Sequence, residues 1–228
     1  MKSRSIAMAG AALLAGAVWS QASYANTFTV DVWTSVESAS KNAQRSAVPG
    51  TTPNFVYDFS TTTGALDLSL PSGGNDSVAG FLATEPLVDG TFTCVGSCTG
   101  AGTAPNLQNS FFEITGTTFV SAGEKYSITH DDGASLYIDG VKVIQSPSPT
   151  NLKTSSGTYT GSNVGNQSFE LVYGENNGLP ADLLATLPIE TTTSTTPLPA
   201  TLPLLAGGLG FLGFLGRRKR KATSAFAA

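Results

Sequence analysis

Apolar and polar residues alternate in short segments along most of the chain between positions 27 and 187. Phe28, Val30 and Val32 alternate with polar neighbours, and similar short apolar-containing segments recur at 55–59, 66–70, 112–114, 126–130, 136–138, 169–173 and 181–187. A period of two places the apolar side chains on one face of a β-strand. Residues 35–45 are polar and could form one helical turn or a loop. The pattern therefore predicts an all-β fold of many short strands.

The segments between these strands carry turn signals of different strength. Asp139-Gly140 separates two apolar segments, and an Asp-Gly pair at this place predicts a two-residue hairpin whose turn positions both have positive φ. Gly116 is predicted to interrupt the strand region that begins at Phe112. Longer loops are predicted at 81–92, 100–109 and 146–165.

The N-terminal end has the features of an export signal. Lys2 and Arg4 precede an apolar stretch from Ile6 to Trp19, and small residues follow at 23 and 25. This order predicts a signal peptide over residues 1–25, cleaved by signal peptidase. A membrane anchor is the alternative, but the apolar stretch is short and no stop-transfer pattern follows it.

The C-terminal end combines an apolar stretch of 19 residues (198–216) with a basic cluster at 217–221. As a helix, 19 residues span ~28 Å, close to the hydrocarbon thickness of a bilayer. The cations favour the cytoplasmic side, so the chain before Leu198 is predicted to lie outside the cytoplasm. A plain C-terminal membrane anchor would have the same features.

A short motif lies at the start of this apolar stretch, at Pro197, Leu198, Pro199 and Ala200. Motif, apolar stretch and basic cluster together resemble the VPLPA variant of the PEP-CTERM sorting signal, with Thr196 in place of Val. The resemblance implies an exosortase-type sorting enzyme in a Gram-negative bacterium that makes exopolysaccharide. It divides the end of the chain into a Thr-rich linker (190–197), a sorting signal (198–221) and a cytoplasmic tail (222–228).

The charge of the exported part limits its partners. All 16 acidic residues but only five of the 12 basic residues lie in residues 26–197, which therefore carry a net charge of −11. Such a surface disfavours nucleic acid and anionic lipid and attracts cations, although solubility alone could account for it. The length suits a single domain, residues 26–189, with one core.

The chain has two cysteines, Cys94 and Cys98. In an oxidising compartment they are predicted to form a disulfide that fixes a turn. Two thiols alone would make a poor metal site.

One group of motifs in the second half of the chain resembles the PA14 domain. The motifs are His130-Asp131-Asp132-Gly133, the following segment from Leu136 to Gly140, and the strand from Phe169 to Glu175. The matching region covers about residues 111–187, and residues 27–109 would supply the opening strands. The resemblance implies an antiparallel β-sandwich used as a sugar-binding or adhesive module, here between a signal-peptide helix and a C-terminal transmembrane helix.

The yeast flocculin branch of that family holds Ca²⁺ between two adjacent aspartates joined by a cis peptide bond, and the ion grips sugar hydroxyls. By resemblance this implies a Ca²⁺ site at Asp131 and Asp132, with further oxygens from Glu175, Asn176 and Asn177. Ca²⁺ prefers six to eight hard oxygen ligands, and a bound dication relieves the repulsion between neighbouring carboxylates. The alternative is that Asp131 and Asp132 only make a turn, in which they bond nearby backbone amides.

These observations favour a non-catalytic protein of the cell surface or exopolysaccharide matrix, first anchored in the inner membrane. Its expected partners are the sorting enzyme and an extracellular polysaccharide. The chain has one histidine and no legible catalytic triad, phosphate loop or basic patch, so it is not expected to be an enzyme. A purely structural matrix protein and a polysaccharide-hydrolase accessory are the alternatives.

Overall fold

The computed structural model describes residues 26–84, 90–95 and 106–188, which all belong to one compact unit spanning residues 1–190. The expected signal peptide, linker, sorting signal and transmembrane segment lie outside the described residues. Within the described ranges, no helix has the length and apolar character needed to cross a membrane.

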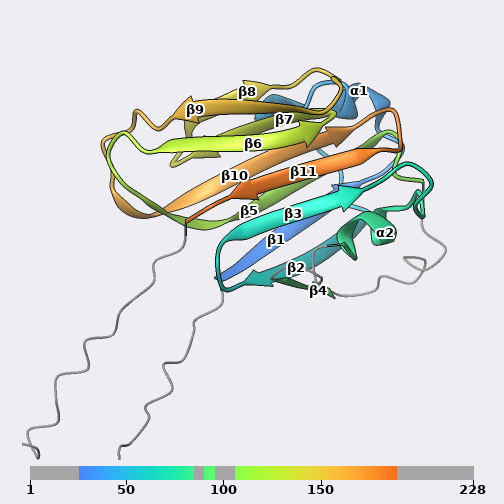
Figure 1. The fold of residues 1–228 in the computed structure, drawn as a ribbon, viewed down its shortest axis with the longest axis horizontal. Coiled ribbons are helices and arrows are strands. Elements are labelled where there is room, and N and C mark those ends of the chain that lie inside the picture. The colour runs from blue at the N-terminus through green and yellow to red at the C-terminus, as the bar shows by residue number, and fades with distance from the viewer. Residues whose placement is uncertain (1–25, 85–89, 96–105, 189–228) are drawn as a thin grey trace, which may run out of the picture. The chain divides into compact units, whose positions relative to one another are not determined.

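Two antiparallel sheets form the unit (Figure 1). The large sheet has the order β4-β2-β1-β5-β10-β7-β8 and the small sheet the order β3-β11-β6-β9. The strands are β1 (Asn26–Trp33), β2 (Phe55–Thr61), β3 (Ala65–Leu70), β4 (Gly90–Cys94), β5 (Ser110–Val120), β6 (Lys125–Asp131), β7 (Gly133–Ile138), β8 (Val141–Ser146), β9 (Lys153–Thr158), β10 (Gly165–Glu175) and β11 (Ala181–Thr186). The predicted all-β antiparallel sandwich is therefore confirmed.

The apolar positions of the alternating segments make the core between the sheets. Phe28, Val30 and Val32 are fully buried, and the Phe28 ring meets Phe169 edge-on at 5.0 Å between ring centroids. β1 pairs with β2 on one side and with β5 on the other, so strands from the first half of the chain enter the same sheet as those from the second half. The described residues between 27 and 109 are thus part of the sandwich and supply its opening strands.

The hairpin predicted at Asp139-Gly140 joins β7 to β8. Both residues have positive φ, 48° and 73°, and Ile138 pairs with Val141 directly across the turn. This turn is the type that matches the twist of the two strands.

Several predicted loops are wrong in part. Residues 81–92 include the end of helix α2 (Val78–Leu82) and the start of β4, and residues 146–165 contain β9. Four of the six residues of β9 are Thr or Ser and the others are Lys153 and Gly157, so this strand at the edge of the small sheet has no apolar alternation. β5 runs through Gly116 without a break. A Cβ atom at Gly116 would lie 2.7 Å from the Phe28 ring, so glycine here makes room for core aromatic rings.

Residues 34–54 cross the outer face of the large sheet and contain α1 (Glu37–Ser40) and η1 (Arg45–Ala47). The short helix α1 agrees with the helical turn considered for residues 35–45. Ala43 of this segment packs in a second apolar cluster with Trp33, Phe111 and Val172 of the large sheet. Trp33 Nε1 donates a 2.8 Å hydrogen bond to the carbonyl oxygen of Thr51. The segment also contacts the loop after β8, because the Ala43 N–H donates to the carbonyl oxygen of Pro147.

Candidate functional site

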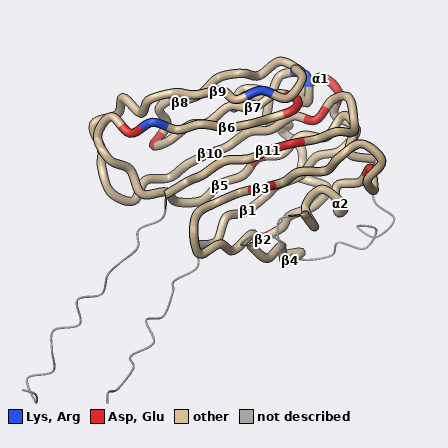
Figure 2. The backbone as a smooth tube through the Cα atoms, viewed as in Figure 1, with Lys and Arg blue, Asp and Glu red and all other residues tan. Residues whose placement is uncertain are grey.

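The predicted site residues meet where the chain crosses from one sheet to the other. β6 of the small sheet ends at Asp131 and β7 of the large sheet begins at Gly133, and the Asp131–Asp132 peptide bond between them is cis, as the resemblance implied. β10 pairs with β7 so that Gly174 lies opposite Gly133. One residue beyond this pair, Asp132 and Glu175 are neighbours. Figure 2 shows acidic residues gathered at this end of the small sheet.

The Asp132 carboxylate is buried, with 1% exposure, and is surrounded by N–H donors. Its Oδ2 accepts hydrogen bonds from the backbone N–H groups of Asn176 (2.9 Å) and Asn177 (3.1 Å). Its Oδ1 accepts from the Asn177 side-chain amide (2.9 Å) and from the Thr150 N–H (3.2 Å). This carboxylate therefore ties together three segments that are far apart in the sequence, namely the β6–β7 junction, the β8–β9 loop and the β10–β11 loop.

Glu175 lies at the end of β10 and is fully buried. Its Oε1 accepts hydrogen bonds from the N–H groups of Asn177 (2.9 Å) and Gly178 (2.8 Å), which shape the β10–β11 loop. Burial, aided by the negative charge of Asp132, raises the pKa of Glu175 to about 9, although the hydrogen bond to Tyr173 acts in the opposite direction. Glu175 is thus predominantly protonated at neutral pH when no cation is bound.

The hydrogen bonding of Tyr173 agrees with a protonated Glu175. The Tyr173 hydroxyl contacts both the carbonyl oxygen of Asp131 and, at 2.8 Å, Oε2 of Glu175. The hydroxyl has one proton, and a carbonyl oxygen can only accept. When Tyr173 donates to Asp131, a proton on Glu175 supplies the second hydrogen bond.

Asp131 is half-buried and belongs to a cross-strand acidic pair. It lies opposite Asp182 of β11. Burial, together with the charges of Asp132 and Asp182, raises the pKa of Asp131 to about 6, while a hydrogen bond from the Leu152 N–H lowers it. The sequence did not point to Asp182, because β11 joins β6 only through the sheet register.

Two polar oxygens near this cluster are buried and have no hydrogen-bond partner. One is the side-chain Oδ1 of Asn176, whose Nδ2 donates to Asn177 Oδ1 at 2.9 Å. The other is Oδ1 of Asp76, which lies in the loop before α2. The space beside Gly178 adjoins Asp76, because a Cβ atom built at Gly178 would lie 3.6 Å from Asp76 Oδ2. Asp76 is far from Glu175 in the sequence, and the tertiary structure brings it to the site.

The residues fit a hard cation in the chemistry of their donors. Carboxylate oxygens of Asp131, Asp132 and Glu175 and the unpartnered amide oxygen of Asn176 are the ligand types that Ca²⁺ prefers. In the described part of the chain, no group of three or more His, Cys, Asp or Glu side chains is arranged to hold a metal ion. A cation here would therefore need amide or backbone oxygens in addition to the carboxylates.

His130 hydrogen-bonds to the backbone of the Asp131–Asp132 dipeptide. It is fully buried, its Nδ1 lies 2.5 Å from the carbonyl oxygen of Asp132, and its Nε2 lies 2.8 Å from Ser155 Oγ on β9. Because the carbonyl oxygen can only accept, Nδ1 carries the proton and Nε2 accepts from the serine. Burial lowers the pKa of His130, which keeps the ring neutral. The histidine is a packed residue of β6, and its hydrogen bond fixes the Asp132 backbone.

Gly133 is required by a close approach of the main chain rather than by turn geometry. A Cβ atom at Gly133 would lie 2.4 Å from the carbonyl oxygen of Pro147. We expect Gly133→Ala to destabilise the protein by about 1–3 kcal/mol, since the β8–β9 loop must move away. Urea unfolding would measure this, with Gly123→Ala as a comparison for a glycine in open space that has positive φ. Equal unfolding midpoints for Gly133→Ala and wild type would contradict the expectation.

Two other predicted sites remain predictions. Cys94 ends β4 next to β2, but Cys98 lies outside the described residues, so their disulfide is not described. The sorting motif from Pro197 to Ala200 lies outside them as well.

Comparisons with known proteins concern the fold. No protein-family model and no functionally described protein sequence matches this chain. Among solved structures, the PA14 domain of the MpAFP antifreeze protein is 14% identical with a TM-score of 0.51, over 73% of this chain and 84% of that domain. The PA14 sugar-binding domain of an RTX adhesin is 19% identical with a TM-score of 0.44, over 71% and 88%. A β-glucosidase from Kluyveromyces marxianus in complex with glucose is 10% identical with a TM-score of 0.32, over 70% of this chain and 15% of the enzyme. The sandwich is therefore PA14-like.

Proposed function

We propose that this chain is an exported, non-catalytic binding protein that holds Ca²⁺ at Asp131 and Asp132 and uses it to bind carbohydrate. The observation that carries the proposal is the convergence of Asp131, Asp132 and the loop of residues 175–178, with the buried Asn176 Oδ1 left without a donor. The PA14-like sandwich and the motif resemblance support the same reading.

The residues of the site would have different roles in binding the ion. Asp131, Asp132 and the Asn176 amide oxygen would hold the ion, and Glu175 would shape the loop through its hydrogen bonds to Asn177 and Gly178. Ca²⁺, when bound, supplies open positions that sugar hydroxyls can fill. His130 and Tyr173 would keep the two backbone carbonyls of the dipeptide in place.

The proposed location rests on the two chain ends. A signal peptide at 1–25 would be removed by signal peptidase. The segment 198–221 would hold the protein in the inner membrane until an exosortase-type enzyme processes it at the Pro197–Ala200 motif. The sandwich would then face the cell surface or the exopolysaccharide matrix.

A specific observation favours a second candidate, a structural matrix protein without a ligand. Four N–H donors satisfy the Asp132 carboxylate, which is the bonding expected if the aspartates only shape a turn.

Calorimetric titration of the full chain with CaCl₂ separates the two candidates. We expect one binding event in the wild type and a loss of at least about tenfold in affinity for Asp131→Asn, which removes one charged ligand from a half-buried position. Asp139→Asn, in the hairpin turn, is the matched control and is expected to bind as the wild type. If the wild type shows no heat of binding, or if Asp131→Asn binds Ca²⁺ with unchanged affinity, the proposed Ca²⁺ site is contradicted and the structural matrix protein is favoured. A glycan screen with Ca²⁺ and with EGTA then tests whether sugar binding requires the ion.

A further inference from the structure

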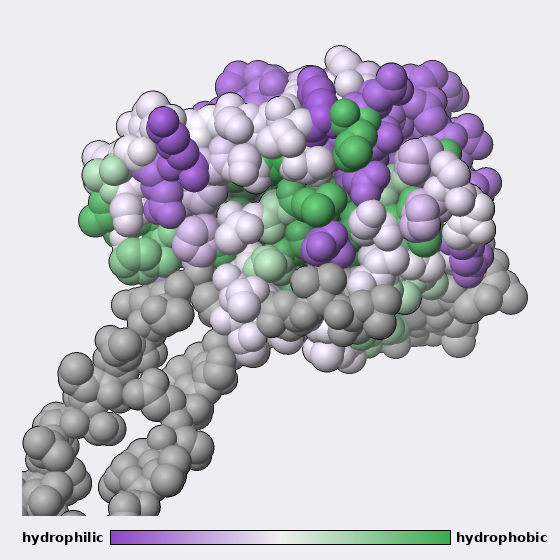
Figure 3. Space-filling view, viewed as in Figure 1, coloured by the Kyte–Doolittle hydropathy of each residue, from purple (hydrophilic) through white to green (hydrophobic). Residues whose placement is uncertain are grey.

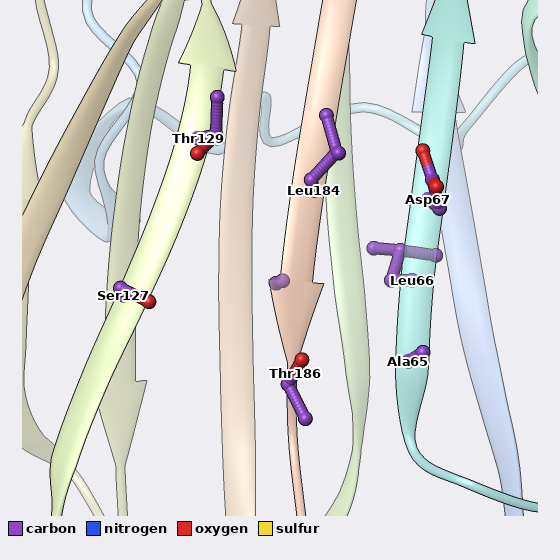
Figure 4. Close-up of a pocket in the computed structure, with 8 residues that line it drawn as sticks. Ala65, Leu66, Asp67, Ser127, Thr129, Leu184 and Thr186 are labelled. Atoms are coloured by element: carbon purple, nitrogen blue, oxygen red, sulfur yellow. The ribbon is translucent and has the colours of Figure 1, made fainter.

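The outer face of the small sheet carries a shallow groove of about 250 Å³. It runs over β3, β11 and β6, where Leu184 lies between Thr129 and Asp67, and Ser127, Thr186 and Ala65 continue it along the strands (Figure 4). Weakly polar residues and apolar patches fill much of the middle of this face, with a few strongly hydrophilic side chains among them and more along its upper margin (Figure 3).

The sheet register makes this groove continuous with the candidate Ca²⁺ site. Leu184 pairs with Thr129 on one side and with Asp67 on the other. The next row of outward-facing residues is Asp131, Asp182 and Ser69, and the Ser69 hydroxyl hydrogen-bonds to Asp182. Residues two apart on a strand share a face and are separated by about 6.6 Å. The groove therefore begins one row from the Asp131 carboxylate.

The groove has the mixed chemistry that a sugar ring needs. Hydroxyl groups come from Ser127, Thr129 and Thr186, and a carboxylate comes from Asp67. The half-buried side chain of Leu184 forms an apolar strip between them, against which the C–H groups of a ring can pack. The Thr129 hydroxyl is already oriented, because it lies 2.8 Å from the hydroxyl of Thr154 on β9. Ligand sites commonly combine an apolar surface with a few placed polar groups in this way.

The charges on this face select for an uncharged ligand. Asp67, Asp131 and Asp182 all face outward along the groove, and Lys125 lies at its far end, beyond Ser127. An anionic polysaccharide would be repelled along most of the groove, whereas hydroxyl groups of a neutral chain can donate hydrogen bonds to these carboxylates.

We infer that the groove binds the continuation of a neutral glycan chain whose terminal or internal sugar is held at Asp131–Asp132. This inference rests on the proposed function and extends it, because it makes the ligand an oligosaccharide rather than a single sugar. The distance along β6 from Asp131 to Ser127 is ~13 Å, so the groove offers room beyond the sugar at the ion.

Chain-length dependence of binding tests the groove. The probes are glucose, galactose and mannose, each as the free sugar and as linear homo-oligomers of two to four units, titrated into the full chain in a detergent without a sugar head group. The variant Ser127→Arg fills the groove from an exposed strand position, and Thr186→Arg does so from β11. Ser168→Arg is the matched control, because Ser168 is an exposed serine on β10 of the other sheet.

We expect the wild type to bind the best tetramer at least about tenfold more tightly than its monomer. Ser127→Arg and Thr186→Arg should remove this gain while the affinity for the monomer stays within about twofold, and Ser168→Arg should behave as the wild type. The groove proposal is overturned if the wild type binds monomer and tetramer with equal affinity, or if both groove variants keep the full gain in affinity for the tetramer. In either case, Ca²⁺-dependent binding of the monomer would still support the proposed function. Tetramer binding that persists in EGTA and is lost in Ser127→Arg supports the groove and contradicts the Ca²⁺ site. If none of the probes binds, both are overturned.

Discussion

Asp132→Asn is expected to destabilise the ion-free protein by about 3 kcal/mol, a large effect for an exchange that barely changes side-chain size. The two carboxylate oxygens accept four N–H hydrogen bonds, and the side chain is 1% exposed. An amide keeps one acceptor and places an NH₂ group against donors. At least one part-buried backbone donor, from Thr150 or Asn176, then loses its partner. Each such loss costs about 1–3 kcal/mol, and hydrogen bonds to a charged acceptor are stronger than neutral ones.

The net effect is smaller than four lost hydrogen bonds would give, for two reasons. The Asn177 side chain is exposed and can turn away, and removal of the Asp132 charge relieves its repulsion of Asp131. Urea unfolding in EGTA measures the change in the free energy of unfolding. The matched control is Asp139→Asn, where positive φ suits asparagine and one hydrogen bond from Asn163 can be kept, so a change below about 0.5 kcal/mol is expected. Equal unfolding energies for the two variants would show that Asp132 does not tie the three segments together.

The ion-free protein is expected to lose stability as pH rises from about 5 to about 9. The pKa of Glu175 is raised to about 9 in the folded protein from an ordinary 4.5, so the folded state binds more protons than the unfolded chain across this range. Stability then falls with increasing pH, and it falls until both states are ionised. Each pKa unit corresponds to about 1.4 kcal/mol, so the total is on the order of several kcal/mol. Asp131, whose pKa is raised to about 6 from 3.8, adds a smaller loss of the same sign at lower pH.

Glu175→Gln is the variant that tests this expectation. Glutamine reproduces the protonated carboxyl group, because its amide can donate to Tyr173 and its oxygen can accept from Asn177 and Gly178. Urea midpoints measured in EGTA at several pH values should fall steeply in the wild type and remain nearly level in Glu175→Gln. Glu37→Gln, at an exposed site on α1 paired with Lys41, is the control and should keep the wild-type slope. A Glu175→Gln variant with the full wild-type slope would assign the pH dependence to other groups.

Added Ca²⁺ should act against this pH dependence if it binds as proposed. An ion at the site favours ionised carboxylates, so binding releases protons from Asp131 and Glu175. The rise in melting temperature caused by Ca²⁺ should therefore grow between pH 6 and pH 9. A rise that is independent of pH, in a protein that does bind Ca²⁺, would place the ion away from these two groups.

The alternation of side chains predicted the central strands because their burial is one-sided. Phe28, Val30 and Val32 show the period of two directly, and Asp139-Gly140 identified the hairpin because its positive φ values are a local property of the chain. Neither β9 nor the role of Gly116 could be predicted from a local sequence pattern. β9 is an edge strand of Ser and Thr, and the role of Gly116 depends on the rings of Phe28 and Phe169, which belong to other strands.

The candidate site was only partly visible in the sequence. Asp131, Asp132 and the loop of residues 175–177 came from a motif resemblance, and the structure brings them together because Gly174 pairs with Gly133. Asp182, Asp76 and Thr150 carry no local signal, because each reaches the site only through sheet register or loop packing.

By itself the sequence determined the strand-rich, two-faced character of the described chain, its hairpin turn and its acidic charge, since these follow from local residue pattern and composition. Only the tertiary structure decided which carboxylates are buried together, which of them shares a proton network with Tyr173, and which rows of side chains line the groove on the small sheet. The physical reason is that burial and hydrogen bonding depend on neighbours from distant strands, and the register that brings those neighbours together is fixed by the packing of the whole sandwich.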